Sequence, residues 1–185
     1  MTDMGQNSSV HILVVEDNRT QGEYLRYLLE KEGYPVIITT NGKEALESIQ
    51  KRRPHLILTD VMMPEMDGYE LCSTIKNNPE TFDIPVILVT HLFNPVDVIR
   101  GLEAGADNFI IKPYTPDIIH SRIASIFQTM NKQDPNDRPT PLTVVFSDRS
   151  YTITATRLQI INILLSTYEV AIKNNSDLQI AQEKL

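Results

Sequence analysis

The sequence of 185 residues contains a single cysteine, Cys72. One cysteine cannot build an internal disulfide framework or a cysteine-based zinc site, and this scarcity is typical of a reducing compartment. The sequence also lacks any apolar run close to the roughly 20 residues of a membrane span, and its start, MTDMGQNSSV, lacks the features of a signal peptide. We therefore expect a cytoplasmic chain without a membrane segment, in which Cys72 is a small buried side chain.

Two further absences concern charge and nucleotide binding. The net charge of −7 arises in residues 1–130, which hold 11 basic and 18 acidic side chains, whereas residues 131–185 hold six of each. Neither part has the basic face that releases counterions from DNA, so we expect no direct binding of nucleic acid. A glycine-rich nucleotide-binding motif is also missing, which excludes a histidine kinase within this chain.

The first 130 residues alternate short β-branched runs with longer helical patterns, which is typical of βα units around a parallel sheet. Each run is apolar at nearly every position, as expected of a strand covered on both faces. The predicted strands are 11–15, 35–40, 55–59, 85–90 and 108–111. The predicted helices, with apolar residues three and four apart, are 19–32, 42–52, 67–77, 94–104 and 115–130. We therefore expect an α/β domain over residues 10–130.

The chain outside this domain divides into segments of different composition. We expect residues 1–9 to be disordered. Residues 131–141, NKQDPNDRPTP, contain three prolines without any helical or strand period, which predicts a linker. Residues 142–155 contain two short β patterns around SDRS and predict a β-hairpin with a four-residue connection.

The last stretch, 156–185, has apolar residues on a helical period and predicts a long helix. Positions three and four residues apart form a seam over about three heptads: Ile161, Leu164, Tyr168, Ala171, Asn175, Leu178, Gln182 and Leu185. This seam predicts a parallel coiled-coil homodimer, with Asn175 setting the register. The alternative is a single amphipathic helix packed on its own domain. The helix also lacks a stop signal, which leads us to expect a longer parent protein.

Polar side chains follow the predicted strands at the point where each strand ends. They are Glu16 and Asp17 after the first strand, Asp60 after the third, Thr90 at the end of the fourth and Lys112 after the fifth. The carboxyl ends of parallel strands share one edge of a sheet, so we expect these groups to converge there. Three carboxylates repel one another unless a cation lies between them, and Mg²⁺ takes carboxylates together with waters and an anionic substrate.

This cluster suits phosphoryl transfer. A carboxylate held on a fixed turn can attack phosphorus and form an acyl phosphate, while Thr90 and Lys112 bond the phosphoryl oxygens. Structural alternatives exist for single members: either Asp17 or Asn18 would cap the following helix, and Asp67-Gly68 is better interpreted as a helix start. The occurrence of such residues at the ends of successive strands favours a phosphoryl-transfer site over these separate structural roles.

The motifs at these strand ends occur in a fixed order: Glu16-Asp17, TDVMMPEMDG with Asp60, LVTH with Thr90, and IIKPY with Lys112-Pro113. With them, the chain from about His11 to Met130 resembles the receiver domain of two-component response regulators. The resemblance implies a flavodoxin-like five-stranded parallel sheet of order 2-1-3-4-5 with helices on both faces, followed here by the hairpin and long helix. It also implies a signalling module rather than an enzyme, with only self-directed phosphotransfer and slow autodephosphorylation.

The resemblance assigns a role to each site residue by position. Asp60 would accept the phosphoryl group from a phosphohistidine on a histidine kinase or a histidine phosphotransfer domain. Glu16, Asp17 and Asp60 would serve Mg²⁺ (or Mn²⁺), with the Met62 backbone carbonyl as a further ligand. Thr90 and Lys112 would assist the transfer.

The same resemblance implies a switch. Thr90 would move toward the phosphoryl group while the ring of Phe109 turns inward, and the face around the fourth helix, fifth strand and fifth helix would carry the output. The Lys112-Pro113 peptide bond would be cis. His91 departs from the family pattern, which mostly has a small residue there, so we expect slowed phosphoryl entry or altered autodephosphorylation unless the ring turns outward.

One further resemblance and one alternative function remain to be considered. The hairpin and long helix are similar to connectors of hybrid sensor kinases, which predicts either a piece of such a protein or a stand-alone regulator that dimerises. The alternative function is a HAD-like aspartyl-phosphate phosphatase acting on a small phosphorylated substrate. Those enzymes place two aspartates separated by one residue after the first strand, where this sequence has Glu16-Asp17.

Overall fold

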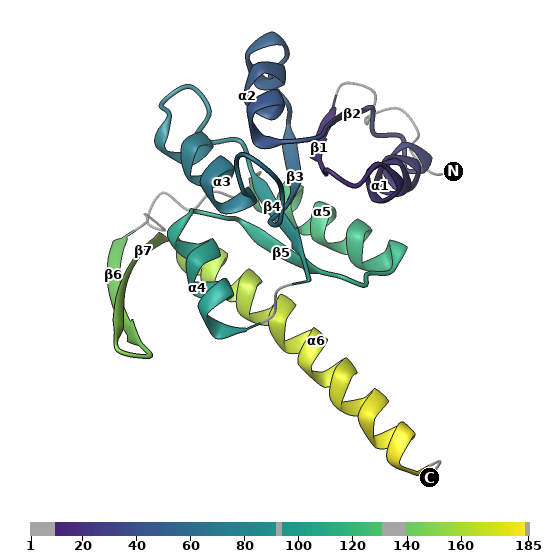
Figure 1. Ribbon diagram of the computed structural model, residues 1–185, viewed down its shortest axis with the longest axis vertical. Coiled ribbons are helices and arrows are strands. Elements are labelled where there is room, and N and C mark those ends of the chain that lie inside the picture. The colour runs from purple at the N-terminus through teal and green to yellow at the C-terminus, as the bar shows by residue number, and fades with distance from the viewer. Residues whose placement is uncertain (1–9, 92–93, 131–139, 184–185) are drawn as a thin grey trace.

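The computed structural model describes residues 10–91, 94–130 and 140–183. Five strands alternate with five helices, and a hairpin and a final helix follow (Figure 1). The alternating elements are β1 (Ile12–Val15), α1 (Arg19–Lys31), β2 (Val36–Thr39), α2 (Gly42–Lys51), β3 (Leu56–Asp60), α3 (Gly68–Asn77), β4 (Val86–Thr90), α4 (Pro95–Glu103), β5 (Asn108–Ile111) and α5 (Pro116–Met130). The predicted disordered residues 1–9, and residues 131–139 of the predicted linker, lie outside the described residues.

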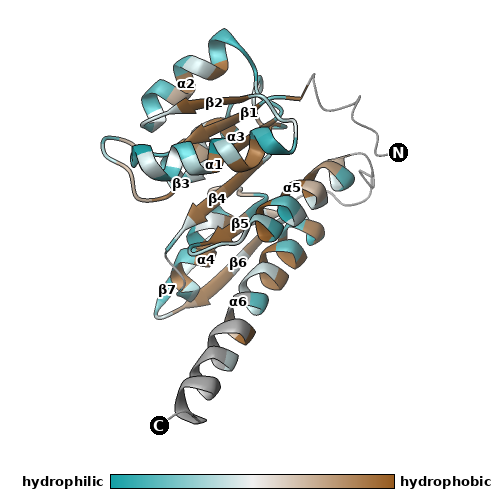
Figure 2. Cartoon of the chain, turned by 90° about the vertical axis from the view of Figure 1, so that its right-hand side faces the viewer, coloured by the Kyte–Doolittle hydropathy of each residue, from teal (hydrophilic) through white to brown (hydrophobic). Residues whose placement is uncertain are grey.

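The five strands form one sheet of order β2-β1-β3-β4-β5, and all neighbouring strands are parallel. Apolar strands separate two layers of core, as expected when helices cover both faces of a sheet. One layer includes residues of α2, α3 and α4, and the other includes residues of α1 and α5. Figure 2 shows the apolar strands between helices whose outer surfaces are hydrophilic. The predicted flavodoxin-like fold is confirmed.

The ends of the helices position the loops of the site. Asn18 caps α1, because its side chain accepts a hydrogen bond from the Gln21 N–H. Asp67 caps α3 in the same way, which agrees with its structural interpretation. Gly68 follows with no room for a side chain, since a Cβ there would lie 2.2 Å from the Asp60 carbonyl oxygen. The loop after β3 therefore folds back tightly on the end of that strand.

The hairpin differs from its prediction at the turn. Strands β6 (Thr140–Phe146) and β7 (Arg149–Ala155) are antiparallel and are joined by two residues, Ser147 and Asp148, instead of four. Both have positive φ angles, 50° and 60°. This conformation matches the twist of the flanking strands, so the pairing continues up to Arg149. The hairpin also starts at Thr140, inside the segment predicted as a linker.

The final helix α6 (Arg157–Glu183) packs on the receiver-like sheet and also leaves apolar side chains exposed. Ile163 is fully buried where α6 packs against β5, while β7 packs against α4. Five large apolar side chains of α6 are exposed: Ile161, Leu164, Leu165, Tyr168 and Ile172. The side chains at predicted seam positions 175, 178, 182 and 185 lie outside the described residues. Within the described chain, α6 and every other helix are too short or too polar to cross a membrane.

Candidate functional site

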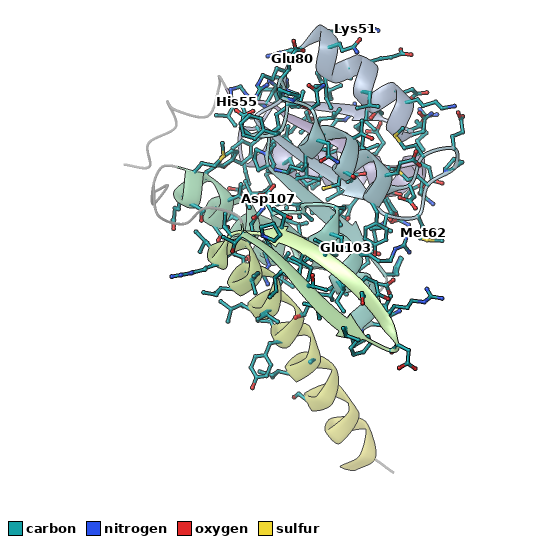
Figure 3. All side chains as sticks on the ribbon, turned by 90° about the vertical axis from the view of Figure 1, so that its left-hand side faces the viewer. Lys51, His55, Met62, Glu80, Glu103 and Asp107 are labelled. Carbon is teal, nitrogen blue, oxygen red and sulfur yellow. The ribbon has the colours of Figure 1, made fainter. Side chains whose placement is uncertain are left out.

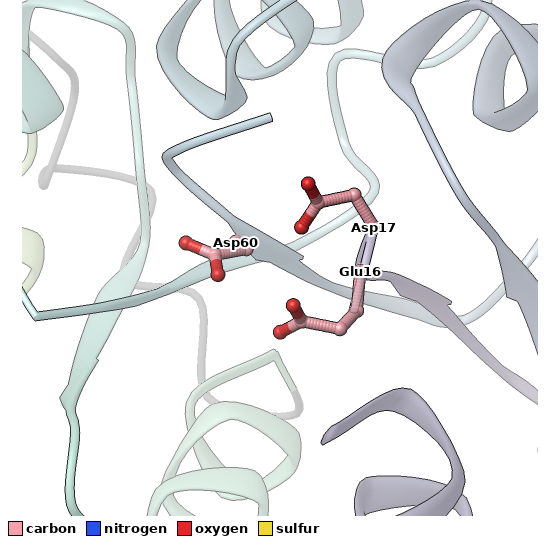
Figure 4. A group of neighbouring side chains, drawn as sticks. All are labelled: Glu16, Asp17 and Asp60. Atoms are coloured by element: carbon pink, nitrogen blue, oxygen red, sulfur yellow. The ribbon is translucent and has the colours of Figure 1, made fainter. Parts of the chain in front are cut away.

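Three carboxylates meet at the carboxyl edge of the sheet, as predicted. Glu16 and Asp17 follow β1, and Asp60 is the last residue of β3 (Figure 4). Each offers a carboxylate oxygen within 4.8 Å of the others. Glu16 and Asp60 are buried while Asp17 is exposed, so the cluster is open to solvent on the side of Asp17.

Lys112 reaches into this cluster from the loop after β5. Its Nζ donates hydrogen bonds to Asp60 Oδ2 at 2.6 Å and to Glu16 Oε2 at 2.9 Å. A third bond runs to Gln21 Oε1 at 2.6 Å. The ammonium therefore holds together the buried carboxylates at the ends of the neighbouring strands β1 and β3, and its three N–H donors all have partners.

Gln21 is the site residue that the sequence analysis missed. It lies in the first turn of α1 and not directly after a strand, so the pattern of polar residues at the strand ends does not include it. The signal was its place three residues after the cap Asn18, because a helix that follows β1 starts at the same edge of the sheet. Its amide supplies Lys112 with a neutral acceptor.

Burial and charge act in opposite directions on the site groups. Burial raises the pKa of Glu16, and the charge of Asp60 adds to this effect, although the bond to Lys112 opposes it. Burial lowers the pKa of Lys112, but its bonds to Asp60 and Glu16 and their charges outweigh burial, so the pKa is raised. Lys112 thus stays protonated, and one ammonium faces three carboxylates.

This donor set fits a divalent cation. With all four groups ionised, the single ammonium leaves two negative charges of the cluster uncompensated. Mg²⁺ in proteins binds hard oxygen donors such as carboxylates together with water molecules, and this cluster offers such donors on a side open to solvent.

Met62 lies beside Asp60. Its N–H donates a hydrogen bond to Asp60 Oδ1 at 3.1 Å, and the residue is 66% exposed at the outer edge of the molecule (Figure 3). The role of the Met62 carbonyl as a ligand stays a prediction.

The predicted switch pair lies on β4 and β5, the two strands on one side of β3. Thr90 is the fully buried last residue of β4, and its carbonyl accepts a 2.8 Å bond from the Lys112 N–H. Phe109 in β5 is 1% exposed and faces the layer beneath α4. It packs so closely on Gly101 that a Cβ there would lie 2.0 Å from its Cζ. The ring therefore occupies an inward position.

Two further expectations concern single positions. The Lys112-Pro113 bond is cis, as the resemblance implies. His91 follows β4 and is exposed, which agrees with the alternative in which its ring turns outward. Its effect on phosphoryl transfer stays a prediction.

Comparisons with known proteins agree with the motifs. Residues 12–124 match the family described as "Response regulator receiver domain". The chain is 38% identical over 131 residues to a probable transcriptional regulator ycf27 of Porphyra purpurea, covering 71% of this chain and 53% of that protein. It is 37% identical over 117 residues to the alkaline phosphatase synthesis transcriptional regulatory protein PhoP of Bacillus subtilis, covering 63% and 48%. The chain thus spans about half the length of these curated relatives.

A solved structure has the same fold. The signal receiver domain of a signal transduction histidine kinase from Syntrophus aciditrophicus superposes with a TM-score of 0.63 at 42% identity. The match covers 74% of this chain and 99% of that domain. The family match over residues 12–124 ends before the hairpin and α6 begin.

Proposed function

Because the chain belongs to the response regulator receiver family of two-component signalling, we propose that Asp60 is its phosphoacceptor. The observation that supports this assignment is the bond between Asp60 and the buried Lys112 at the strand ends. Among the three clustered carboxylates, Asp60 lies at the end of the central strand of the sheet. The strand holds the Asp60 carboxylate in a fixed position beside the Lys112 ammonium, as a nucleophile requires.

In the proposed reaction, a carboxylate oxygen of Asp60 forms a bond to phosphorus. The bond between phosphorus and the imidazole nitrogen of the donor phosphohistidine breaks, and the released nitrogen keeps the electron pair. Lys112 then bonds one phosphoryl oxygen, and the Thr90 hydroxyl bonds another. The reaction is self-directed, and slow hydrolysis of the acyl phosphate resets the chain.

The residues that would hold Mg²⁺ (or Mn²⁺) are Glu16, Asp17, Asp60 and the Met62 carbonyl, with Asp17 and Asp60 the most direct. When bound, the ion neutralises charge on the transferring phosphoryl oxygens. Without it, the two uncompensated charges of the cluster would repel an incoming phosphate. We therefore expect transfer to require the ion.

The direct partner we propose is a histidine kinase or a histidine phosphotransfer domain in the cytoplasm. The curated relatives are named as transcriptional regulators, but the match covers about half of them. In this chain, residues 131–185 are electroneutral and form a hairpin and a helix where they are described. This supports an output other than direct binding of nucleic acid.

We also propose that a second copy of the chain covers the exposed stripe of α6. The stripe consists of Ile161, Leu164, Leu165, Tyr168, Ala171 and Ile172, which includes the first four predicted seam positions. Side chains at this spacing pack between two parallel helices. Light scattering tests this: the wild type should give a dimer mass and Leu164→Glu a monomer mass. Thr167→Glu, off the stripe, is the control, and a monomeric wild type would reject the dimer.

The HAD-like phosphatase is not supported, because the matched family and the solved structure are receiver domains.

The test of the phosphoacceptor uses acetyl phosphate and Mg²⁺ with the wild type and with Asp60→Asn. The wild type should gain one phosphoryl group by intact mass, only with Mg²⁺, and the variant none. The control is Asp67→Asn, because asparagine also caps a helix. Equal incorporation in Asp60→Asn would contradict the assignment.

A further inference from the structure

A C-terminal segment of the chain covers the face on which the family resemblance predicts an output. This docked segment comprises residues 140–169: the hairpin and the first half of α6. Its strand β7 packs against α4, and its helix packs against β5 (Figure 1). An external partner could not bind α4 and β5 here without displacing the docked segment.

Polar contacts fix the docked segment at separate points along this face. Its hydrogen bonds to the sheet domain include Thr152 N to Glu103 Oε1 (3.0 Å), Gln159 Nε2 to Asp107 Oδ1 (2.8 Å) and Ser166 Oγ to Asn108 Oδ1 (2.7 Å). Figure 3 labels Glu103 and Asp107 beside the hairpin. An ion pair of Arg122 with Glu169 adds a contact to α5. The docked segment is thus held by side chains of α4, the loop before β5, β5 and α5.

The docked segment contributes apolar side chains to the core that contains the switch residue Phe109. Ile153, Ala155 and Ile163 are buried and belong to the same core cluster as Phe109. Burial of these apolar side chains stabilises the docked position. The inward ring of Phe109 and these side chains of the docked segment therefore belong to one apolar core.

Strand β5 connects this contact to the phosphorylation site. Asn108 bonds Ser166 at one end of the strand, and Lys112 bonds Asp60 just beyond the other end. Phe109 lies between them, one residue after Asn108. A strand advances about 3.3 Å per residue, so four residues span roughly 13 Å. One short strand therefore joins the contact with the docked segment to the phosphorylation site.

We propose that the docked segment is the receiver's own partner, and that its docking and the phosphorylation of Asp60 favour one another. The proposal rests on the proposed function and on the switch that the family resemblance implies, in which phosphorylation draws the ring of Phe109 inward. With β7 on α4 and α6 on β5, a ring that left the cluster toward that edge would collide with the docked segment. Docking therefore selects the inward ring, and linkage makes the preference reciprocal. The exposed stripe of α6 is held in a position that depends on Asp60.

The test compares binding of beryllofluoride, a phosphoryl analogue, with Mg²⁺ by two variants of the full chain. Ile163→Asp places a charge in the buried contact, and Thr154→Asp places the same charge at an exposed position of β7, in the same docked segment. Ile163→Asp should raise the half-saturating beryllofluoride concentration about tenfold. Thr154→Asp should leave it unchanged. Ser166→Ala, which keeps the apolar contact, should give a smaller shift in the same direction.

Hydrogen exchange of the wild type provides the reciprocal measurement. Beryllofluoride should increase the protection of amides in residues 149–155 and 157–169. Equal or tighter binding by Ile163→Asp and Ser166→Ala, or unchanged protection in a wild type that binds the analogue, would overturn the coupling alone. A wild type that does not bind beryllofluoride, or an Asp60→Asn variant that binds it equally, would overturn the proposed function together with the coupling.

Discussion

Lys112 Nζ lies 2.6 Å from Asp60 Oδ2, and both side chains are almost completely buried. The same nitrogen is 2.9 Å from Glu16 Oε2. The cation therefore reaches the proposed nucleophile without any movement of the backbone. Its charge offsets the repulsion between two carboxylates that the ends of β1 and β3 hold together.

Replacing this cation should destabilise the fold. In Lys112→Gln, two buried carboxylates lose their charged partner, and we expect the free energy of unfolding to fall by about 3–5 kcal/mol in the presence of a chelator. Mg²⁺ should restore part of the loss, since it supplies the missing positive charge. Denaturant titration with and without Mg²⁺ measures both effects. The control is Lys43→Gln, which removes an exposed pair with Glu65 and should change stability little.

Substitution at Gly101 should disturb the ring of Phe109. A Cβ at Gly101 would lie 2.0 Å from Phe109 Cζ, so Gly101→Ala should cost about 1–3 kcal/mol of unfolding free energy through overpacking. Gly22→Ala in α1 is the matched control. Its Cβ would meet Ile38 at an ordinary 3.5 Å, and alanine favours a helix by up to about 1 kcal/mol over glycine. Equal stability of the two variants in thermal melts would refute the close packing on Phe109.

His91 tests whether a bulky side chain beside Thr90 affects the chemistry. The ring is exposed, so His91→Ala should leave stability unchanged while the rate of phosphorylation rises or the rate of autodephosphorylation changes. Both rates can be measured by intact mass after addition and removal of acetyl phosphate. If neither rate changes, the side chain has no part in the site.

Acidification should destabilise the domain through His11, which lies at the opposite edge of the sheet. Burial lowers the pKa of His11 from 6.5, and nearby Arg52 and His55 lower it further. The folded state therefore takes up this proton at lower pH than the unfolded state, so stability falls as pH drops below about 6.5 until the folded group titrates. His11→Gln should flatten the dependence between about pH 7 and pH 5, as measured by urea unfolding. His120→Gln, at an exposed position, is the control.

The sheet and most of the site could be predicted because both follow from local patterns. The five strands are apolar runs whose ends differ from the structure by at most one residue, and the groups at those ends converge because the strands are parallel. Gln21 could not be found in this way, because its role depends on how α1 begins over the strand ends. Its nearest signal was the cap Asn18.

The C-terminal part was harder to predict. The four-residue turn was wrong because Ser147 and Asp148 both accept positive φ angles, and a sequence pattern of β residues does not show where pairing stops. The period of α6 was interpreted as one seam, but the helix is apolar on two sides: Ile163 packs on the sheet domain and Leu164 is exposed. Which side packs on the domain depends on the complementary surface of α4 and β5.

The most direct test is to locate the phosphoryl group. The wild type is phosphorylated with acetyl phosphate and Mg²⁺, the acyl phosphate is reduced with borohydride, and the chain is digested and sequenced by mass spectrometry. Reduction converts an aspartyl phosphate to homoserine, so position 60 should read as homoserine while positions 17 and 67 stay aspartate. Homoserine at position 17 or 67 instead, or at none of the three in phosphorylated protein, would contradict the account.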